Sequence, residues 1–107
     1  MATKKDKEVV FKLIEKYLKV MREHNIPVWR LYLYGSYAKD VYRPDSDIDL
    51  AVFWDKDEID GFDEDVLLMK LTRNVDLRIE PHSFARTDFD DTDPYIKEIL
   101  KTGERIL

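Results

Sequence analysis

The sequence predicts a small α/β or α+β fold, in which helices pack on one face of a mixed β-sheet. Two patterns point to it. Apolar residues recur at helical spacing in some segments and alternate at strand spacing in others, with breaker residues between them. The chain has 107 residues, of which 44% are hydrophobic. We therefore expect one layered domain over residues 1–107.

The first part of the chain predicts a long helix followed by a strand. The helix spans about residues 5–24, because its apolar side chains fall on one face. The Asn-Ile-Pro sequence at 25–27 ends it. Residues 28–34 are rich in aromatic and β-branched side chains, which favour a strand. The apolar face of the helix comprises Val10, Leu13, Ile14, Tyr17, Leu18 and Met21.

A turn and a second strand are expected next. Gly35 ends the first strand, and residues 36–40 start a short helix. Residues 42–46 are polar and form a loop, and the second strand covers residues 47–54.

The middle of the chain predicts a helix and a third strand. The helix covers about residues 63–73, after an acidic stretch that we expect to be a solvated loop or, alternatively, a partner-facing one. Residues 75–80 alternate cleanly, which predicts a strand that Pro81 terminates. The residues expected on the buried side of the helix are Phe62, Val66 and Met69, with Leu67 and Leu71 as further candidates.

The C-terminal segment predicts a last helix. Asp93 is a good N-cap, and Pro94 suits the first helical position. The helix covers residues 94–101 and closes at Gly103, and residues 105–107 form a short edge strand.

Two carboxylates lie two residues apart in the second strand. Residues i and i+2 of a strand face the same side, about 6.5 Å apart, so Asp47 and Asp49 project together. Like charges on one face repel each other, and such a pair is seldom kept for stability alone. Oxygen ligands of this kind hold Mg²⁺. The pair therefore indicates a divalent metal site, and the alternative is an ordinary polar face on an edge strand.

The spacing of a Gly-Ser turn and this acidic pair resembles a known signature. Gly35-Ser36, ten residues and then Asp47-Ile48-Asp49 are similar to the pattern of the nucleotidyltransferase superfamily that includes DNA polymerase beta and kanamycin nucleotidyltransferase. The short chain and the segment GSYAKD…PDSDIDLAVF resemble its minimal nucleotidyltransferases, often found beside HEPN-domain proteins. Val75-Asp76-Leu77 resembles the strand of the third metal carboxylate, and IKEILKTGERIL resembles the closing helix and tail. The resemblance implies a polymerase beta-like palm fold.

The resemblance also implies a set of catalytic residues. Asp47, Asp49 and Asp76 are expected to hold two Mg²⁺ ions, with Glu80 as the rival of Asp76. Two ions of this kind stabilise the attacking and the leaving oxygens of nucleotidyl transfer. His82 shows no partner pattern that suggests a metal ligand or a base.

The Gly-Ser turn is the expected nucleotide-binding element. Gly35 permits close approach of the backbone, and the N–H groups around Ser36 favour the triphosphate anion. Lys39 either contacts phosphate or is a solvated residue. The family usually has Arg-Gly where this chain has Lys39-Asp40: Lys39 keeps the charge but not the bidentate fork, and Asp40 adds negative charge near the triphosphate.

Composition limits the partners. The net charge is −5 and the acids are clustered, whereas proteins that bind nucleic acids present a basic face, so we expect no nucleic-acid template. The absence of cysteine excludes disulfides, thiolate zinc sites and a cysteine nucleophile. No apolar run approaches the roughly 20 residues that span a membrane, and the start of the chain lacks a signal-peptide pattern. We expect a cytoplasmic protein.

The expected function is Mg²⁺-dependent transfer of AMP from ATP to a hydroxyl. By resemblance, the acceptor is a tyrosine of a HEPN toxin, and this chain is the antitoxin. One alternative is a binding module that neutralises the toxin by complex formation alone, with a vestigial nucleotide site. Another is transfer to a small molecule such as an aminoglycoside, but those enzymes carry a second domain. A homo-oligomer and a hetero-oligomer both remain open.

Overall fold

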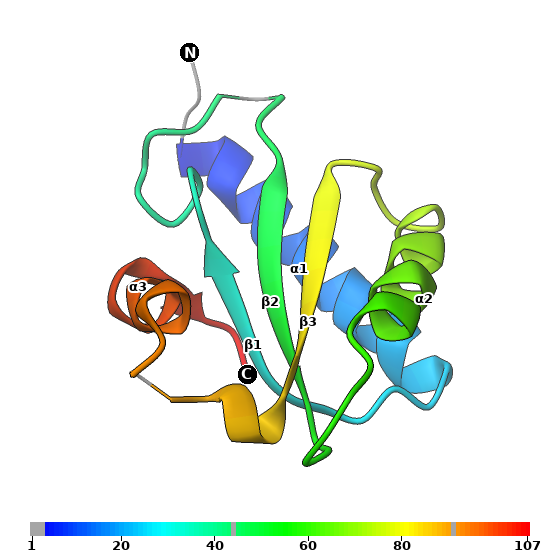
Figure 1. The fold of residues 1–107 in the computed structure, drawn as a ribbon. Helices are drawn as coiled ribbons and strands as arrows, with labels where there is room; N and C mark the ends of the chain where they lie inside the picture. The colour runs from blue at the N-terminus through cyan, green and yellow to red at the C-terminus, as the bar shows by residue number, and fades with distance from the viewer. Residues whose placement is uncertain (1–3, 44, 91) are drawn as a thin grey trace.

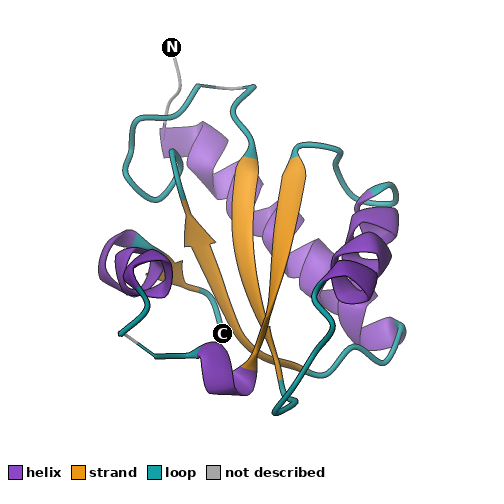
Figure 2. Ribbon diagram, viewed as in Figure 1, coloured by secondary structure: helices purple, strands orange, loops and turns teal. Residues whose placement is uncertain are grey.

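Four strands form one mixed sheet with helices around it (Figures 1 and 2). The computed structural model describes residues 4–43, 45–90 and 92–107, so position 44 of the expected loop lies outside it. The strand order is β3-β2-β1-β4, with β1 antiparallel to β2 and β4, and β3 parallel to β2. The elements are α1 (Lys4–Glu23), β1 (Val28–Tyr34), β2 (Ile48–Trp54), α2 (Phe62–Thr72), β3 (Ile79–Ala85), the 3₁₀ turn η1 (Arg86–Asp88), α3 (Pro94–Thr102) and β4 (Glu104–Arg105). The α/β class and the mixed sheet are confirmed.

The central strand β2 supplies two hydrophobic cores. Ile48, Leu50 and Val52 pack with buried residues of α1 and α2 on one face. Ala51 and Phe53, on the other face, pack with the buried isoleucines of α3. The expected placement of helices on one face therefore holds for α1 and α2, whereas α3 covers the opposite face. The reason is that β2 carries apolar side chains on both faces, and each face must be covered.

The end of α1 shows how the predicted breaker sequence works. Asn25 adopts a left-handed conformation, with φ of 60°. The amide of Ile26 donates to the carbonyl of Met21 at 3.0 Å, and the amide of Asn25 donates to that of Arg22 at 3.0 Å. These two bonds form a Schellman cap, and the buried side chains of Met21 and Ile26 supply its usual apolar contact. The cap sends the chain back into β1.

The third strand begins four residues later than the sequence predicted. The amides of Val75 and Asp76 both donate to the carbonyl of Thr72 at 2.9 Å, so these residues close α2 instead of starting a strand. The prediction of a strand over 75–80 was therefore wrong. Its alternating pattern is real, but the end of the helix uses the backbone groups that a strand would need.

Proline lies inside β3 because this strand is at the edge of the sheet. Alternate amides of an edge strand point away from the neighbouring strand, and Pro81 occupies one of those positions, where no amide is required. The next two outward amides have side-chain acceptors: Ser83 donates to Asp65 Oδ1 at 2.7 Å, and Ala85 donates to Asp88 Oδ2 at 2.9 Å. Pro81 therefore does not terminate the strand.

Helix α2 buries a different face from the one predicted. Leu68, Leu71 and Thr72 are its buried residues, and the Tyr17 hydroxyl of α1 donates to the Leu68 carbonyl at 2.8 Å. The residues expected inside are exposed, with 74% of Phe62 and 49% of Met69 accessible. Two sets of apolar residues in this helix have helical spacing, and only its position against the sheet selects one. An open groove of about 570 Å³, here called the α2 groove, is lined by Phe62, Asp65, Val66, Met69, Lys70, Thr72, Arg73 and Leu77.

The last helix agrees closely with the sequence, whereas two short segments differ from it. Asp93 caps α3, accepting the Tyr95 amide at 2.8 Å, and Pro94 is its first residue. Residues 35–40 form turns rather than the expected short helix, and β4 is Glu104–Arg105 rather than 105–107. Among the described residues, no helix combines the length and the apolar character that a membrane span requires.

We predict that Leu68→Ala lowers the free energy of unfolding by about 2–5 kcal/mol, because it leaves a cavity in the core. Met69→Ala should cost less than about 1 kcal/mol, since this neighbouring side chain is half exposed and both changes improve helix propensity. Urea unfolding followed by circular dichroism measures both. Equal losses would show that the buried face of α2 is misassigned.

Candidate active site

The site is built where β1 ends beside the start of β2. In the antiparallel pairing, Tyr34 opposes Asp49, and Gly35 follows with a positive φ of 73°. A Cβ atom at position 35 would overlap Asp49 Oδ2. Glycine is therefore required twice, by the left-handed backbone and by the carboxylate packed against it. This explains why the Gly-Ser turn and the second aspartate occur together.

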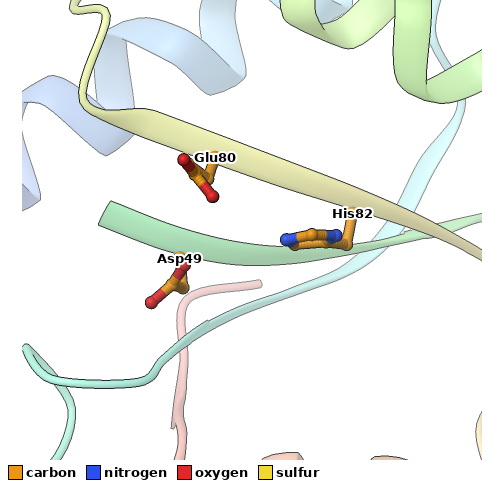
Figure 3. A group of neighbouring side chains, drawn as sticks. All are labelled: Asp49, Glu80 and His82. Atoms are coloured by element: carbon orange, nitrogen blue, oxygen red, sulfur yellow. The ribbon is translucent and has the colours of Figure 1, made fainter. Parts of the chain in front are cut away.

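The parallel pairing of β2 and β3 adds two further side chains. Asp49 is paired in register with Glu80, and Ala51 with His82. One ligand atom each of Asp49, Glu80 and His82 lies within 4.8 Å of the other two, and the three side chains project into the same space (Figure 3). We call this group the Asp-Glu-His cluster. Carboxylate oxygens and an imidazole nitrogen are donors that hold divalent cations.

The electrostatics of the cluster favour a cation. Partial burial raises the pKa of Asp49, and the neighbouring carboxylates of Glu80 and Asp47 raise it further, whereas His82 opposes them. The ionised form of Asp49 is therefore disfavoured by lost hydration and by negative neighbours. A bound cation would remove both causes, so these residues fit a divalent metal ion.

Asp47 lies outside this compact group. It is exposed and comes one residue before β2 begins. Its charge still reaches the site, since it contributes to the raised pKa of Asp49. The structure thus keeps Asp47 and Asp49 electrostatically coupled without placing both on the regular strand.

The placement of Asp76 is corrected. This residue lies in the turn after α2, where its carboxylate accepts the Arg78 amide at 2.8 Å and the Arg78 guanidinium at 3.1 Å. The bonds to Arg78 hold the pKa of Asp76 below its usual value. Glu80, its rival in the sequence, lies beside Asp49 instead. The difference follows from the later start of β3.

The Gly-Ser turn borders a small cleft. Within the turn, the Lys39 amide donates to the Gly35 carbonyl at 3.2 Å, and the Val41 amide donates to the Ser36 carbonyl at 3.0 Å. Lys39 Nζ lies 3.6 Å from a carboxylate oxygen of Glu98, and both side chains are largely exposed. Exposed pairs of this kind contribute little, so Lys39 is available to another anion. A cleft of about 250 Å³ is lined by Tyr34, Gly35, Lys39, Tyr95, Glu98, Ile99 and Thr102.

Asp40 occupies a conformation that suits glycine. Its φ is 58°, in the left-handed region that Asp tolerates better than most residues. Its carboxylate forms an ion pair with Lys7 Nζ at 3.0 Å, and Lys7 also binds Glu104 at 2.6 Å. Lys7 of α1 therefore partly neutralises the negative charge of Asp40.

His82 was missed by the sequence analysis. Its two-residue spacing from Glu80 is the strand repeat that drew attention to Asp47 and Asp49. The Glu80–His82 spacing was not recognised as a strand repeat, because the third strand was expected to end at Pro81 and His82 then fell outside it. With β3 at its true position, both side chains fall on the face of Asp49.

Comparison with known proteins identifies the family. The Polymerase beta, Nucleotidyltransferase family model matches residues 14–107, so the chain belongs to the polymerase beta nucleotidyltransferase family and is a nucleotidyltransferase. A proposed nucleotidyltransferase from Sulfolobus solfataricus has a similar fold, with a TM-score of 0.67 and 15% identity, covering 94% of this chain and 82% of that one. No curated protein sequence matches the chain.

Two further structures of similar fold are toxin–antitoxin systems. One, determined with AMP-PNP, has a TM-score of 0.61 and 20% identity, covering 87% of this chain and 71% of that one. A mutant of the toxin–antitoxin MntA–HpeT has a TM-score of 0.60 and 19% identity, covering 87% and 70%. At these identities, the likeness establishes the fold.

We predict that Gly35→Ala is more destabilising than Gly61→Ala. Both glycines have positive φ, which costs about 1–3 kcal/mol for alanine. A Cβ atom at position 61 meets nothing within 4 Å, whereas at position 35 it meets Asp49, which adds about 1–3 kcal/mol of overpacking. Urea unfolding gives the difference, and isothermal titration with Mg²⁺ should show weaker binding for Gly35→Ala alone. Equal stability and equal binding in the two variants would contradict the contact.

Proposed function

We propose that this nucleotidyltransferase transfers AMP from ATP to a hydroxyl group of a partner protein in a metal-dependent reaction. The observation that carries the proposal is the register of β2 and β3, which brings Asp49 and Glu80 together beside the Gly35 turn. Family membership supplies the reaction class. The identities of the acceptor and of the nucleotide go beyond family membership and are part of the proposal.

Each site residue has a role in the proposed reaction. Asp49 and Glu80 hold a divalent cation, and Asp47 adds negative charge at the exposed side, where a second ion is expected. The ions would supply positive charge to the attacking and the leaving oxygens. The acceptor oxygen bonds to the α-phosphorus of ATP, and the bond from that phosphorus to the bridging oxygen breaks. Pyrophosphate leaves, and the acceptor proton passes to solvent.

The turn after β1 is the proposed nucleotide site. Gly35 and Ser36 present backbone to the triphosphate, and Lys39 exchanges its exposed contact with Glu98 for phosphate. The adjoining cleft has aromatic walls from Tyr34 and Tyr95, whose hydroxyls are 2.9 Å apart. AMP-PNP in one toxin–antitoxin structure of similar fold supports ATP as the nucleotide.

The proposed partner is a toxin with a HEPN domain, and its proposed acceptor is a tyrosine. The toxin–antitoxin structures of similar fold support a toxin. The small cleft is bordered by α3, the end of β1 and the turn after it, so the rest of an acceptor pocket would come from a protein docked against it. A toxin that binds RNA must carry positive charge, which complements the net charge of −5 of this chain.

The α2 groove is proposed as a second contact surface for this toxin, apart from the small cleft, because α2 and α3 cover opposite faces of the sheet. Apolar residues at its edge are widely exposed, Leu77 to 78% and Phe62 to 74%. The adjoining segment 55–65 contains seven acidic residues and one basic residue. Arg86 neutralises only Asp55 and Asp57 among them. The groove itself is lined by Lys70 and Arg73 as well as Asp65, so its apolar residues are the main attraction there, and the acidic segment beside it suits a basic rim on the partner.

We predict that ATP and Mg²⁺ together raise the melting temperature more than either does alone, because both bind the native state. At 100 times Kd the stabilisation is about 2.7 kcal/mol. Asp49→Asn and Glu80→Gln should abolish the joint effect. Asp76→Asn should retain it, since that carboxylate is bonded to Arg78. Loss in the Asp76 variant with no loss in the Glu80 variant would reverse their roles.

We predict that co-incubation with ATP and Mg²⁺ adds one or more AMP units to a HEPN toxin encoded beside this chain, as intact-mass spectrometry would show. Asp49→Asn should still bind the toxin but add no mass. If the wild-type chain and Asp49→Asn both neutralise the toxin and neither changes its mass, the chain would instead be a binding module that does not use its nucleotide site.

The docking surface is tested in the same assay. Val66→Arg places a positive charge in the α2 groove and should weaken toxin binding at least tenfold, measured by isothermal titration. Val9→Arg is the matched control, because Val9 is also exposed but lies on α1. Equal affinity of the two variants would place the toxin elsewhere.

A further inference from the structure

We propose that His82 is a nitrogen ligand of the cation held by Asp49 and Glu80, so that this site selects a divalent first-row transition metal, such as Mn²⁺, over Mg²⁺. The proposal rests on the proposed metal-dependent function for the existence of the site, and goes beyond it in the identity of the ligands and of the ion.

The position of His82 is fixed by the sheet. It lies two residues after Glu80 on the same face of β3 and opposes Ala51 of β2, a residue with only a methyl side chain. The ring is half-buried on the face of the sheet that carries Asp49 and Glu80, and it projects toward these two carboxylates (Figure 3).

His82 has no other polar role within the described part of the chain. Its ring nitrogens form no hydrogen bond and no ion pair there, and its one ring contact is with Tyr34, at 6.2 Å between centroids. The structure therefore presents an imidazole whose hydrogen-bonding capacity is unused, held beside two carboxylates by backbone pairing.

The spacing of the cluster suits a cation between its members. The ligand atoms lie within 4.8 Å of one another, yet the imidazole makes no direct bond to either carboxylate. Ligands on opposite sides of a divalent ion at about 2.1 Å each are about 4.2 Å apart. A small inward movement of the side chains would close the group on one ion.

The chemistry of the donors selects the metal. Mg²⁺ prefers oxygen ligands in strict octahedral geometry, whereas imidazole binds first-row transition metals more readily. Two carboxylates and one neutral imidazole balance the charge of a divalent ion. A site of three carboxylates would suit Mg²⁺ and Mn²⁺ alike, whereas an imidazole ligand favours the transition ion, so His82 is the residue that shifts the preference.

The test uses Mn²⁺ alone with the full chain, without nucleotide. Electron spin echo envelope modulation of bound Mn²⁺ should show a nitrogen coupling, which His82→Gln should remove. Titration followed by electron paramagnetic resonance should show Mn²⁺ binding at least tenfold weaker in His82→Gln, with Mg²⁺ binding little changed. His24→Gln is the matched control and should keep the coupling, because His24 lies at the end of α1 and bonds to the Val20 carbonyl.

Each outcome decides the proposal. Mn²⁺ bound without a nitrogen coupling, or a coupling that survives in both His82→Gln and His82→Asn, would overturn the ligand assignment and leave a metal-dependent function standing. No binding of either ion to the wild-type chain or its ATP complex would overturn the proposed function as well. Circular dichroism of the variants separates loss of binding from loss of folding.

Discussion

The register between β2 and β3 is the constraint on which the rest of the molecule depends. A slip of one residue in a strand sends its side chains to the opposite face. The pairing that buries Ile48 against Ile79 therefore also places Asp49 beside Glu80. Core and site are consequences of the same hydrogen-bonded ladder, and α2 is the crossover that allows the two strands to run parallel.

Placing Asp49 beside Glu80 has an electrostatic cost. Because the pKa of Asp49 is raised in the folded protein, the folded state binds this proton more tightly than the unfolded chain does. The contribution of Asp49 to stability is thus present at low pH and is lost as pH rises from its ordinary pKa of 3.8 through its folded value. At neutral pH the protein tolerates this loss, as functional sites often require.

The first half of the fold could be predicted from sequence, since local patterns there decide the structure. The apolar stripe of α1, the residues of β1 and the Gly35 turn each have a mechanism that acts within a few residues. In the second half, the cap and extent of α3 could be predicted as well, but the start of β3 and the buried face of α2 could not. Residues 75–80 alternate as well as β3 does, and α2 has two apolar faces, so the choice depends on the neighbouring strand and helix. The error at β3 gave the place of the third carboxylate to Asp76, with Glu80 as its rival, and left His82 out of the predicted site.

The outer side of β3 limits how this protein can associate. An edge strand normally offers a row of free amides to which another chain can add. Here Pro81 has no amide, and Asp65 and Asp88 occupy those of Ser83 and Ala85. A foreign strand finds no donors at these positions, so sheet extension and amyloid-like stacking are discouraged along this border. With these donors occupied, recognition at this border relies more on side chains than on backbone pairing, which lowers the risk of indiscriminate self-association.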